Sequence, residues 1–497
     1  MNLPSWLETT SRNHPDKLAL TFGEERWTFA ELYRHVNAAA ETLTSALPDP
    51  PGRIGILSAN RPGFVLAVLA AVRLGIPVVP LNPRLSPAEL AFQIADADIT
   101  LLLADETHDA AAVAQSSRNL AVIPISSIEN RPEKTLPSPC AQGEGLGVRV
   151  NLTAEAAVFY TSGTSGRPKG AILTYGNLWF SAISSVLHLG HRSHDVWLLT
   201  MPLFHVGGLA ILFRSIIGAT PVILHDRFDP QRALHAIDAG AALVSLVPAM
   251  LDRMLALRND RPWPPHLRCI LLGGSAAPPQ LLETCLRLGI PVAPTYGLTE
   301  ATSQVATLLP EQVQAHLGSS GRPLPLTDIR IVTEHGEAPP GAIGEIEIRG
   351  PTNFRGYLGD SEARDPDAWF ATGDIGYLDD DGYLVVVDRR HDLIISGGEN
   401  VYPAEIERVL RSHPLVADAG VVGIPHETWG ARPIAVVVWR GDPTHADPEL
   451  RRHCATELSS FKIPDRFVLA TELPRTPSGK LLRRVLSEHI APARRGT

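Results

Sequence analysis

One stretch of the chain has the composition of a phosphate-binding loop. Residues 160–170 read YTSGTSGRPKG, and the last ten of them hold three glycines, four hydroxyl side chains and two cations. Glycines let backbone N–H groups approach phosphate oxygens, hydroxyls donate hydrogen bonds, and Lys169 adds positive charge. The stretch lacks the Gly-Lys-Ser/Thr ending of a Walker loop. A flexible linker is the alternative, but the apolar runs on both sides favour a loop between two buried strands.

Six further segments combine reactive side chains with glycine- or proline-rich turns. They include a lone histidine before two glycines, a carboxylate two residues after a Gly-Leu pair, and an isolated lysine near the C-terminus. Any one of these segments is a weak signal. In chain order the seven segments are YTSGTSGRPKG (160–170), PLFHVGG (202–208), YGLTE (296–300), TGD (372–374), DRRHD (388–392), SGGEN (396–400) and PRTPSGK (474–480).

Together and in this order, the segments resemble the adenylate-forming superfamily of acyl-CoA synthetases, peptide-synthetase adenylation domains and luciferases. The resemblance extends from about Trp27 to Arg484. It implies an enzyme that joins a carboxylic acid to AMP, releases pyrophosphate, and then transfers the acyl group to a thiol. ATP and a carboxylate repel each other, so such a site needs cations and hydrogen-bond donors.

The resemblance also implies roles for individual residues. Thr299 would contact the α-phosphate, Glu300 would hold Mg²⁺, and Lys480 would bridge the carboxylate and the α-phosphate. His205 would line and gate the acyl pocket. The other expected residues are Thr161, Ser162, Gly163, Thr164 and Lys169 at the β- and γ-phosphates; Tyr296, Gly273, Gly274 and Ser275 around adenine; Asp374 and Arg389 at the ribose; and Gly397, Gly398 and Glu399 on the CoA path.

Three of these residues have a purely structural interpretation when taken alone. His205 could be a core histidine, Glu300 a solvated carboxylate at a helix start, and Lys480 a surface lysine. The sequence departs from the family at the hinge of the small domain. That position is usually Asp or Lys, and here it is occupied by His391.

The region after Phe204 bears on the choice of acid. Domains that activate amino acids need an acidic pocket residue, and the residues directly after Phe204, His-Val-Gly-Gly, include none, so amino acids are not expected. Fatty acids need an apolar tunnel, but Arg214 interrupts the apolar run. Burying a guanidinium is costly without a partner anion. Arg214 therefore either snorkels to the surface or meets a second carboxylate of the substrate, with Ser303 and Gln304 as further candidate contacts.

Longer stretches, such as residues 202–214 and 388–405, resemble the 2-succinylbenzoate–CoA ligases within the superfamily, whose substrate is an aromatic keto-diacid. The expected partners are a small carboxylic acid, ATP and CoA, with Mg²⁺ as cofactor. Three alternatives stay open. They are a ligase for another aryl or medium-chain acid, an enzyme that loads a carrier protein, and a protein that binds ATP or an acyl-adenylate without turnover.

The motifs are set among short apolar strands that alternate with helical stretches. Apolar runs such as 222–224 and 269–272 read as buried strands, and SPAE at 86–89 is a capping box that starts a helix. This alternation predicts a mostly parallel sheet flanked by helices. Residues 344–350 alternate strictly, which is typical of a half-buried antiparallel strand.

These patterns and the resemblance predict an α/β protein of two domains. Residues 1–388 would form a large N-terminal adenylation domain that binds ATP and the acid. It would consist of mostly parallel sheets flanked by helices plus a β-barrel-like subdomain. Residues 389–497 would form a small, mobile α+β C-terminal domain with the catalytic lysine and the CoA path. A chain of 497 residues is also too long for a single core.

The overall composition excludes several classes of protein. The net charge is −9 and no basic face is evident, so nucleic acid is not an expected partner. None of the four cysteines belongs to a Cys-x-x-Cys pair, which fits a reducing cytoplasm and argues against a zinc site. The longest apolar region, 64–81, is broken by Arg73, Gly75 and two prolines, so no membrane span or signal peptide is expected. A homo-oligomer is compatible with the sequence.

Overall fold

The computed structural model describes residues 2–47, 52–106, 120–129, 149–162, 168–259, 261–388, 393–440, 442–474, 481 and 483–490. The chain folds into two compact units. The first consists of Met1–Pro83, Ile94–Phe159 and Gly170–Asp388, and the second of Arg84–Gln93, Tyr160–Lys169 and Arg389–Thr497.

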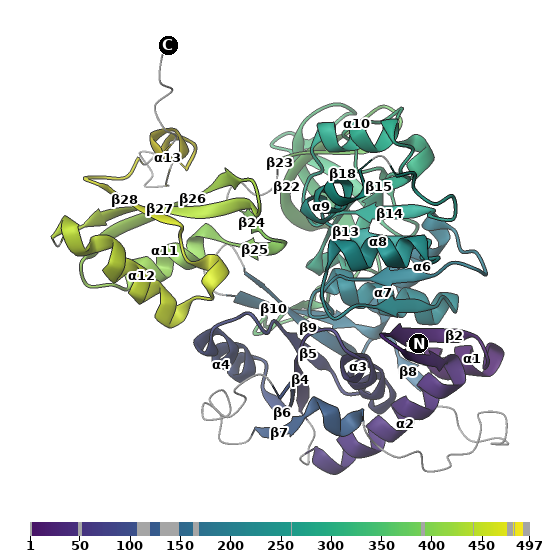
Figure 1. The fold of residues 1–497 in the computed structure, drawn as a ribbon. Helices are drawn as coiled ribbons and strands as arrows, with labels where there is room; N and C mark the ends of the chain where they lie inside the picture. Colours follow the sequence, from purple (N-terminus) through teal and green to yellow (C-terminus); the bar gives the residue numbers. More distant parts are fainter. Residues whose placement is uncertain are drawn as a thin grey trace. The chain divides into compact units, whose positions relative to one another are not determined.

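The first unit contains a nine-stranded sheet, to which β13, β14 and β15 belong (Figure 1). The six strands from β15 to β2 run parallel, whereas β16, β17 and β3 pair antiparallel. In spatial order the strands are β17 (Arg322–Pro323), β16 (Ser303–Thr307), β15 (Val292–Leu298), β14 (Cys269–Leu272), β13 (Leu243–Leu246), β11 (Trp197–Leu199), β12 (Val222–Leu224), β2 (Leu18–Phe22) and β3 (Glu25–Thr28).

A second, seven-stranded sheet is also mostly parallel, with β10 and β21 antiparallel at one edge. Its order is β21 (Gly356–Tyr357), β10 (Pro168–Thr174), β9 (Glu155–Ser162), β5 (Val78–Leu81), β4 (Arg53–Leu57), β6 (Ile99–Ala104) and β7 (Ala121–Pro124). Strands β9 and β10 flank the glycine-rich stretch, as predicted. The short strands β1 (Asn2–Pro4) and β8 (Arg149–Asn151) pair separately.

A five-stranded antiparallel sheet follows the two larger sheets, in addition to the mostly parallel sheets that the sequence predicted. Its order runs from one edge strand to the other: β19 (Gly336–Glu337), β18 (Asp328–Thr333), β20 (Gly344–Arg349), β22 (Phe370–Leu378) and β23 (Leu384–Asp388). The strand predicted from strict alternation at 344–350 is β20, and its partners on both sides are antiparallel.

Helices cover both faces of the nine-stranded sheet because alternate strand residues point to opposite sides. Trp197 and Leu199 of β11 join the core that contains α7, while Leu198 joins the core that contains α8. Helices α6 and α7 pack against each other (Figure 1). The helices of the first unit are α1 (Trp6–Asn13), α2 (Phe29–Ala46), α3 (Pro62–Leu74), α6 (Tyr175–Leu189), α7 (Val206–Gly218), α8 (Pro230–Asp238), α9 (Pro248–Arg258) and α10 (Pro279–Arg287), and α4 (Pro87–Asp96) begins in the second unit.

Local sequence signals explain where many helices begin. Thr28 and Glu31 form a reciprocal capping box at the start of α2, and Ser86 and Glu89 do so at α4, as predicted. Helices α3, α8, α9 and α10 each start with a proline, whose missing N–H would have no partner in the first turn.

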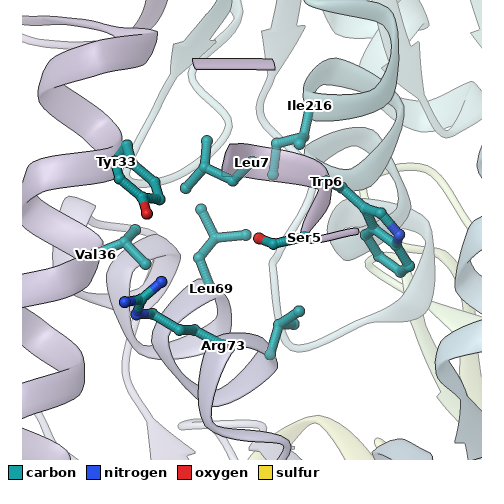
Figure 2. Close-up of a pocket in the computed structure, with 9 residues that line it drawn as sticks. Ser5, Trp6, Leu7, Tyr33, Val36, Leu69, Arg73 and Ile216 are labelled. Carbon is teal, nitrogen blue, oxygen red and sulfur yellow. The ribbon is translucent and has the colours of Figure 1, made fainter. Parts of the chain in front are cut away.

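A small cavity lies between helices of the first unit near the N-terminus. The cavity of about 20 Å³ is lined by nine residues of the segments around α1, α2, α3 and α7, including Trp6, Tyr33, Leu69, Arg73 and Ile216 (Figure 2). A space of this size holds about one water molecule. It is therefore a packing defect and too small for a substrate.

The second unit is an α+β fold around one sheet. Its order is β25 (Glu399–Val401), β24 (Ile394–Ser396), β27 (Gly430–Trp439) and β26 (Val416–His426), with β28 (Arg466–Ala470) parallel to β27. Helices α11 (Pro403–Arg411), α12 (Ala446–Glu457) and α13 (Arg483–Ile490) accompany it. Helix α11 buries Ile406, Val409 and Leu410 in one core. Within the described residues, no helix is both long and apolar enough to cross a membrane.

Candidate active site

Many of the predicted site residues in the first unit follow the carboxyl ends of strands in the nine-stranded sheet. Gly273 follows β14, Thr299 follows β15, and His205 lies in the loop between β11 and α7. In open α/β sheets, ligands bind at the carboxyl ends of parallel strands. The topology thus gathers motifs that are far apart in the sequence at one edge of the sheet.

The turn after β14 has two glycines, Gly273 and Gly274, and its geometry disfavours any larger side chain at either position. A Cβ on Gly273 would lie 2.7 Å from the Thr295 side chain, and Gly274 has a φ of +79°, which disfavours other residues. Ser275 is half-buried beside them. The turn therefore offers a close backbone approach to a flat ligand, which is what an adenine would need.

Tyr296 and Asp374 come from different sheets and meet in the buried interior. The Tyr296 hydroxyl donates to Oδ2 of Asp374 at 2.7 Å, and only 2% and 9% of the two residues are exposed. Thr372 accepts a hydrogen bond from the Asp374 backbone N–H at 3.1 Å. These contacts fix the Asp374 carboxylate in one orientation. They also join Tyr296, predicted to lie beside the adenine, to Asp374, predicted to bind the ribose of the same nucleotide.

Glu300 lies in the short 3-10 helix η2 (Thr299–Ala301), directly after β15. It is only 7% exposed, so the solvated carboxylate considered above does not fit the structure. The Tyr357 hydroxyl donates to its Oε1 at 2.8 Å, and the Phe354 backbone N–H donates to its carbonyl at 2.8 Å. One segment thus holds both the side chain and the backbone of Glu300.

The turn that follows Glu300 is backbone-strained. Thr302 and Ser303 have φ values of +55° and +94°, which are unusual for residues with a side chain. The hydroxyl of Thr302 donates to the Thr352 carbonyl at 2.7 Å, and Ser181 donates to the Thr302 carbonyl at 2.6 Å. Strain of this kind persists only where the surroundings hold it, and it clusters at functional sites.

Arg214 is buried, so the first of the two alternatives that the sequence left open, a snorkelling surface residue, is wrong. It is 2% exposed, and its Nη2 donates to Ser303 Oγ at a long 3.4 Å. Its guanidinium carbon lies 5.9 Å from the centroid of the Trp197 ring. Among the described residues its Nε has no hydrogen-bond partner. Burial lowers the pKa of Arg214 from 12.5 to about 10, and among those residues no carboxylate opposes this effect.

Gln304 is also buried and only partly satisfied. Its Nε2 donates to Thr307 Oγ1 at 2.8 Å, and that hydroxyl lies 2.8 Å from Thr295 Oγ1. The Gln304 Oε1 has no partner among the described atoms. An acceptor cannot bind a carboxylate, so in this orientation Gln304 is a weaker candidate than Ser303 for the substrate anion.

His205 precedes the first turn of α7 and is half-buried. Its backbone N–H donates to the Pro202 carbonyl at 3.1 Å, and its ring lies 4.7 Å from that of Phe204. The second glycine after His205, Gly208, packs so closely that a Cβ would lie 2.1 Å from the Pro202 oxygen. The loop that carries the imidazole is therefore closely packed on the helix.

Predicted site residues of the second unit are partly described. The Thr161 hydroxyl lies 3.5 Å from the carbonyl of Lys169, whose side chain is exposed. Gly397 and Gly398 have φ values of +61° and +87°, where glycine is favoured. Glu399 is 5% exposed and accepts from Nη1 of Arg84, in the same unit, at 3.1 Å. Gly163, Thr164, Arg389, His391, Lys480 and the side chain of Ser162 lie outside the described residues.

Sequence reasoning missed the residues that hold the predicted ones. Tyr357 orients Glu300 across 57 residues of chain, and Trp197 lies beside Arg214. Asn60 bonds to the loop that precedes His205. No local spacing signals these contacts, because each joins elements that are distant in sequence.

Comparisons with known proteins agree with this geometry. Residues 7–358 match the family described as AMP-binding enzyme, and residues 405–480 match the AMP-binding enzyme C-terminal domain. The 2-succinylbenzoate–CoA ligase of Bacillus licheniformis is 42% identical over 98% of this chain and 100% of its own length.

Solved structures of o-succinylbenzoate CoA synthetase from Bacillus subtilis are similar over almost the whole chain. A double mutant bound with the product analogue OSB-NCoA has a TM-score of 0.90 at 38% identity, covering 98% of this chain and 99% of that one. The complex with the acyl-adenylate OSB-AMP has a TM-score of 0.73 at 39% identity, covering 100% of both chains. The complex with ATP and magnesium has a TM-score of 0.72 at 38% identity, covering 98% and 100%. The chain belongs to the AMP-binding enzyme family.

Proposed function

We propose that this protein is an AMP-forming acid–thiol ligase that converts 2-succinylbenzoate into its CoA thioester. In the first step a carboxylate oxygen attacks the α-phosphorus of ATP, and the bond to pyrophosphate breaks. In the second step the CoA sulfur attacks the acyl carbon, and AMP leaves. Relatives that share about 42% of the sequence over the full length carry this activity in their names.

The guanidinium of Arg214, which is buried and faces no carboxylate among the described residues, is the observation that carries the choice of substrate. A fully buried charge without a counter-ion is strongly unfavourable unless a ligand supplies the missing anion. With a pKa of about 10, Arg214 is still protonated at neutral pH. A diacid can bring one carboxylate to the reaction and a second one to Arg214. Ser303, 3.4 Å from the guanidinium, would complete the polar end of the acyl pocket.

The nucleotide would bind along the same edge of the sheet. The turn at Gly273 and Gly274 gives close backbone access for adenine, with Tyr296 beside it. Asp374, held by Tyr296 at 2.7 Å, would accept hydrogen bonds from the ribose hydroxyls. Thr299, one residue before Glu300, would donate to the α-phosphate, where negative charge builds up in the transition state.

Glu300 fits a Mg²⁺ ligand. It is an oxygen donor whose direction is set by Tyr357, and Mg²⁺ sites at phosphates commonly use one or two carboxylates together with phosphate oxygens and water. Bound there, the ion would neutralise the charge of the polyphosphate. A group of three or more metal-ligating side chains was not found among the described residues, so the phosphates would provide the remaining ligands.

The remaining roles rest on the motifs. Residues 1–388 would bind ATP and the acid, and residues 389–497 would bring Lys480 to the reacting carboxylate and line the CoA path with Gly397, Gly398 and Glu399. The phosphate loop would act through Thr161, Ser162, Gly163, Thr164 and Lys169. Arg389 would assist at the ribose, His391 would act as the hinge, and Gln304 would border the acyl pocket. The described cysteines are free and buried, and we infer a reducing cytoplasmic location from the cysteine pattern.

The deciding experiment is ATP–pyrophosphate exchange with 2-succinylbenzoate, benzoate and octanoate, followed by thioester formation with CoA. We expect exchange with 2-succinylbenzoate far above the other two, and thioester with CoA. If only another acid supported exchange, the assignment of 2-succinylbenzoate as substrate would be wrong, but the assignment as a ligase would stand. Thioester on a pantetheinylated carrier but not on CoA would indicate a loading enzyme, and binding without exchange would indicate a binding protein.

A further inference from the structure

Asn60 occupies a buried position between the loops that leave two neighbouring parallel strands. It lies between β4 and α3 and is 3% exposed. Its Nδ2 donates to the carbonyl of Met201 at 2.9 Å and to the carbonyl of His225 at 3.1 Å. Its Oδ1 accepts from the backbone N–H of Leu203 at 2.8 Å. The orientation of the amide is unambiguous, because two acceptors face one end and a donor faces the other.

The two loops belong to the reactive edge of the sheet. Met201 and Leu203 follow β11, His225 follows β12, and these strands run parallel with Leu199 opposite Leu224. The backbone N–H of His225 also donates to the Leu199 carbonyl at 3.0 Å. One side chain thus ties the carboxyl ends of both strands together, at the edge where ligands bind in such sheets.

The bonds of Asn60 extend to His205 through a short, rigid path. Pro202 lies between Met201 and Leu203, two of the three residues that Asn60 binds, and its carbonyl accepts a hydrogen bond from the backbone N–H of His205 at 3.1 Å. The same carbonyl is in close contact with Gly208, where a Cβ would lie at 2.1 Å. The loop cannot shift without moving either His205 or the first turn of α7, the helix that also carries Arg214.

The position of Asn60 is itself secured from the other side. Arg61 donates to both carboxylate oxygens of Glu129, and Nε to Oε1 measures 2.8 Å. The Gly63 backbone N–H also donates to that carboxylate at 2.6 Å. These bonds place the Glu129 carboxylate at the N-terminus of α3, where a negative charge interacts favourably with the helix dipole. These contacts hold the turn that carries Asn60 in place, so its side-chain amide can position the loop at residues 201–203.

We propose that Asn60 is a positioning residue for the acyl site, which sets the place of His205 by holding the backbone on either side of Pro202. The inference rests on the proposed role of His205 in lining and gating the acyl pocket. The effect of Asn60 on His205 is transmitted by the loop whose backbone it holds.

The test uses Asn60→Ala and the isosteric Asn60→Asp, which keeps the shape but removes both donors. Ser319→Ala is the matched control, because Ser319 is equally buried and makes two backbone hydrogen bonds elsewhere in the unit. KM for 2-succinylbenzoate and for ATP is measured by pyrophosphate exchange, alone and combined with His205→Ala. Melting temperature is recorded for every variant.

We expect both Asn60 variants to raise KM for the acid by roughly ten- to a hundred-fold, since small displacements of positioning groups have effects of this size. KM for ATP should stay within about two-fold, and Ser319→Ala should lower the melting temperature without an acid-selective change. The Asn60→Ala, His205→Ala double variant should be no worse than His205→Ala alone, because coupled residues are not additive.

Three results would overturn the inference. The first is a rise of KM for ATP that is as large as the rise of KM for the acid. The second is a double variant whose increase in acid KM is the product of the increases in the two single variants. The third is a His205→Ala protein with an unchanged KM for the acid. Wild-type protein that exchanges a different acid would contradict the substrate assignment instead, and the same comparison made with that acid would still decide the role of Asn60.

Discussion

Replacing Arg214 by methionine should make the free protein no less stable but much less active on its substrate. The buried guanidinium has its pKa lowered from 12.5 to about 10. A shift of this size corresponds to a cost of about 3 kcal/mol for keeping the charged form in the folded protein at neutral pH. Methionine fills a similar volume without charge, so replacing the arginine is expected to be neutral or stabilising by about 1–4 kcal/mol.

Although Arg214→Met should not destabilise the protein, it should strongly reduce activity on 2-succinylbenzoate. Removing one partner of a buried, hydrogen-bonded ion pair costs about 3–5 kcal/mol, and each 1.4 kcal/mol is about a factor of ten. Arg214→Met should therefore reduce kcat/KM for 2-succinylbenzoate by at least about a hundred-fold. The analogue 4-oxo-4-phenylbutanoate has the same chain and keto group but lacks the ring carboxylate. Its kcat/KM should change by less than about three-fold.

The assay is pyrophosphate exchange with both acids, together with thermal unfolding of both proteins with and without each acid. Wild-type protein should gain a higher melting temperature from 2-succinylbenzoate than from the analogue, and Arg214→Met should lose this difference. If Arg214→Met reduced kcat/KM equally for both acids, Arg214 would not face the second carboxylate of the substrate. A melting temperature well below that of wild type would show that the guanidinium has a structural partner that the described contacts do not include.

Three further changes test the nucleotide side. Tyr296→Phe removes the 2.7 Å bond to Asp374, so KM for ATP should rise about five- to thirty-fold, with KM for the acid unchanged in exchange assays. Glu300→Gln should shift the Mg²⁺ concentration for half-maximal exchange upward by about ten-fold or more, measured by Mg²⁺ titration against chelator, since the amide lacks the charge of the carboxylate. Lys480→Ala should lower the rate of adenylate formation by at least about a hundred-fold, while thioester formation from synthetic acyl-adenylate and CoA changes little, as measured in single turnovers.

Each of these predictions has a contrary outcome. A Tyr296→Phe protein with unchanged KM for ATP would remove the Tyr296–Asp374 contact from the ribose site. An unchanged Mg²⁺ titration would exclude Glu300 as a ligand, with Glu337→Gln, an exposed carboxylate in β19, as the control. Equal losses in both half-reactions would show that Lys480 acts beyond adenylation.

Much of the architecture follows from local patterns in the sequence. Short apolar runs predicted β12 and β14 with their observed bounds, and strict alternation predicted β20 as an antiparallel strand. The capping box at Ser86 predicted the start of α4. These predictions hold because periodicity, capping and proline geometry act over a few residues and leave a direct trace in the sequence. The seven motifs in order likewise identified the family.

The surroundings of the site residues were not predictable in the same way. Arg214 was equally compatible with a snorkelling surface residue, and only the packing of α7 in the core shows that it is buried. Tyr357 and Asn60 were not singled out at all, although one orients Glu300 and the other holds the loop before His205.

The sequence by itself thus determined which residue types this protein has for activating an acid, and in which kind of fold. The tertiary structure decided that the Arg214 guanidinium is buried with no carboxylate beside it among the described residues, and that the Asn60 amide holds the loop before His205. Burial and hydrogen bonding between distant segments depend on the whole packed core at once, and no short stretch of sequence encodes them.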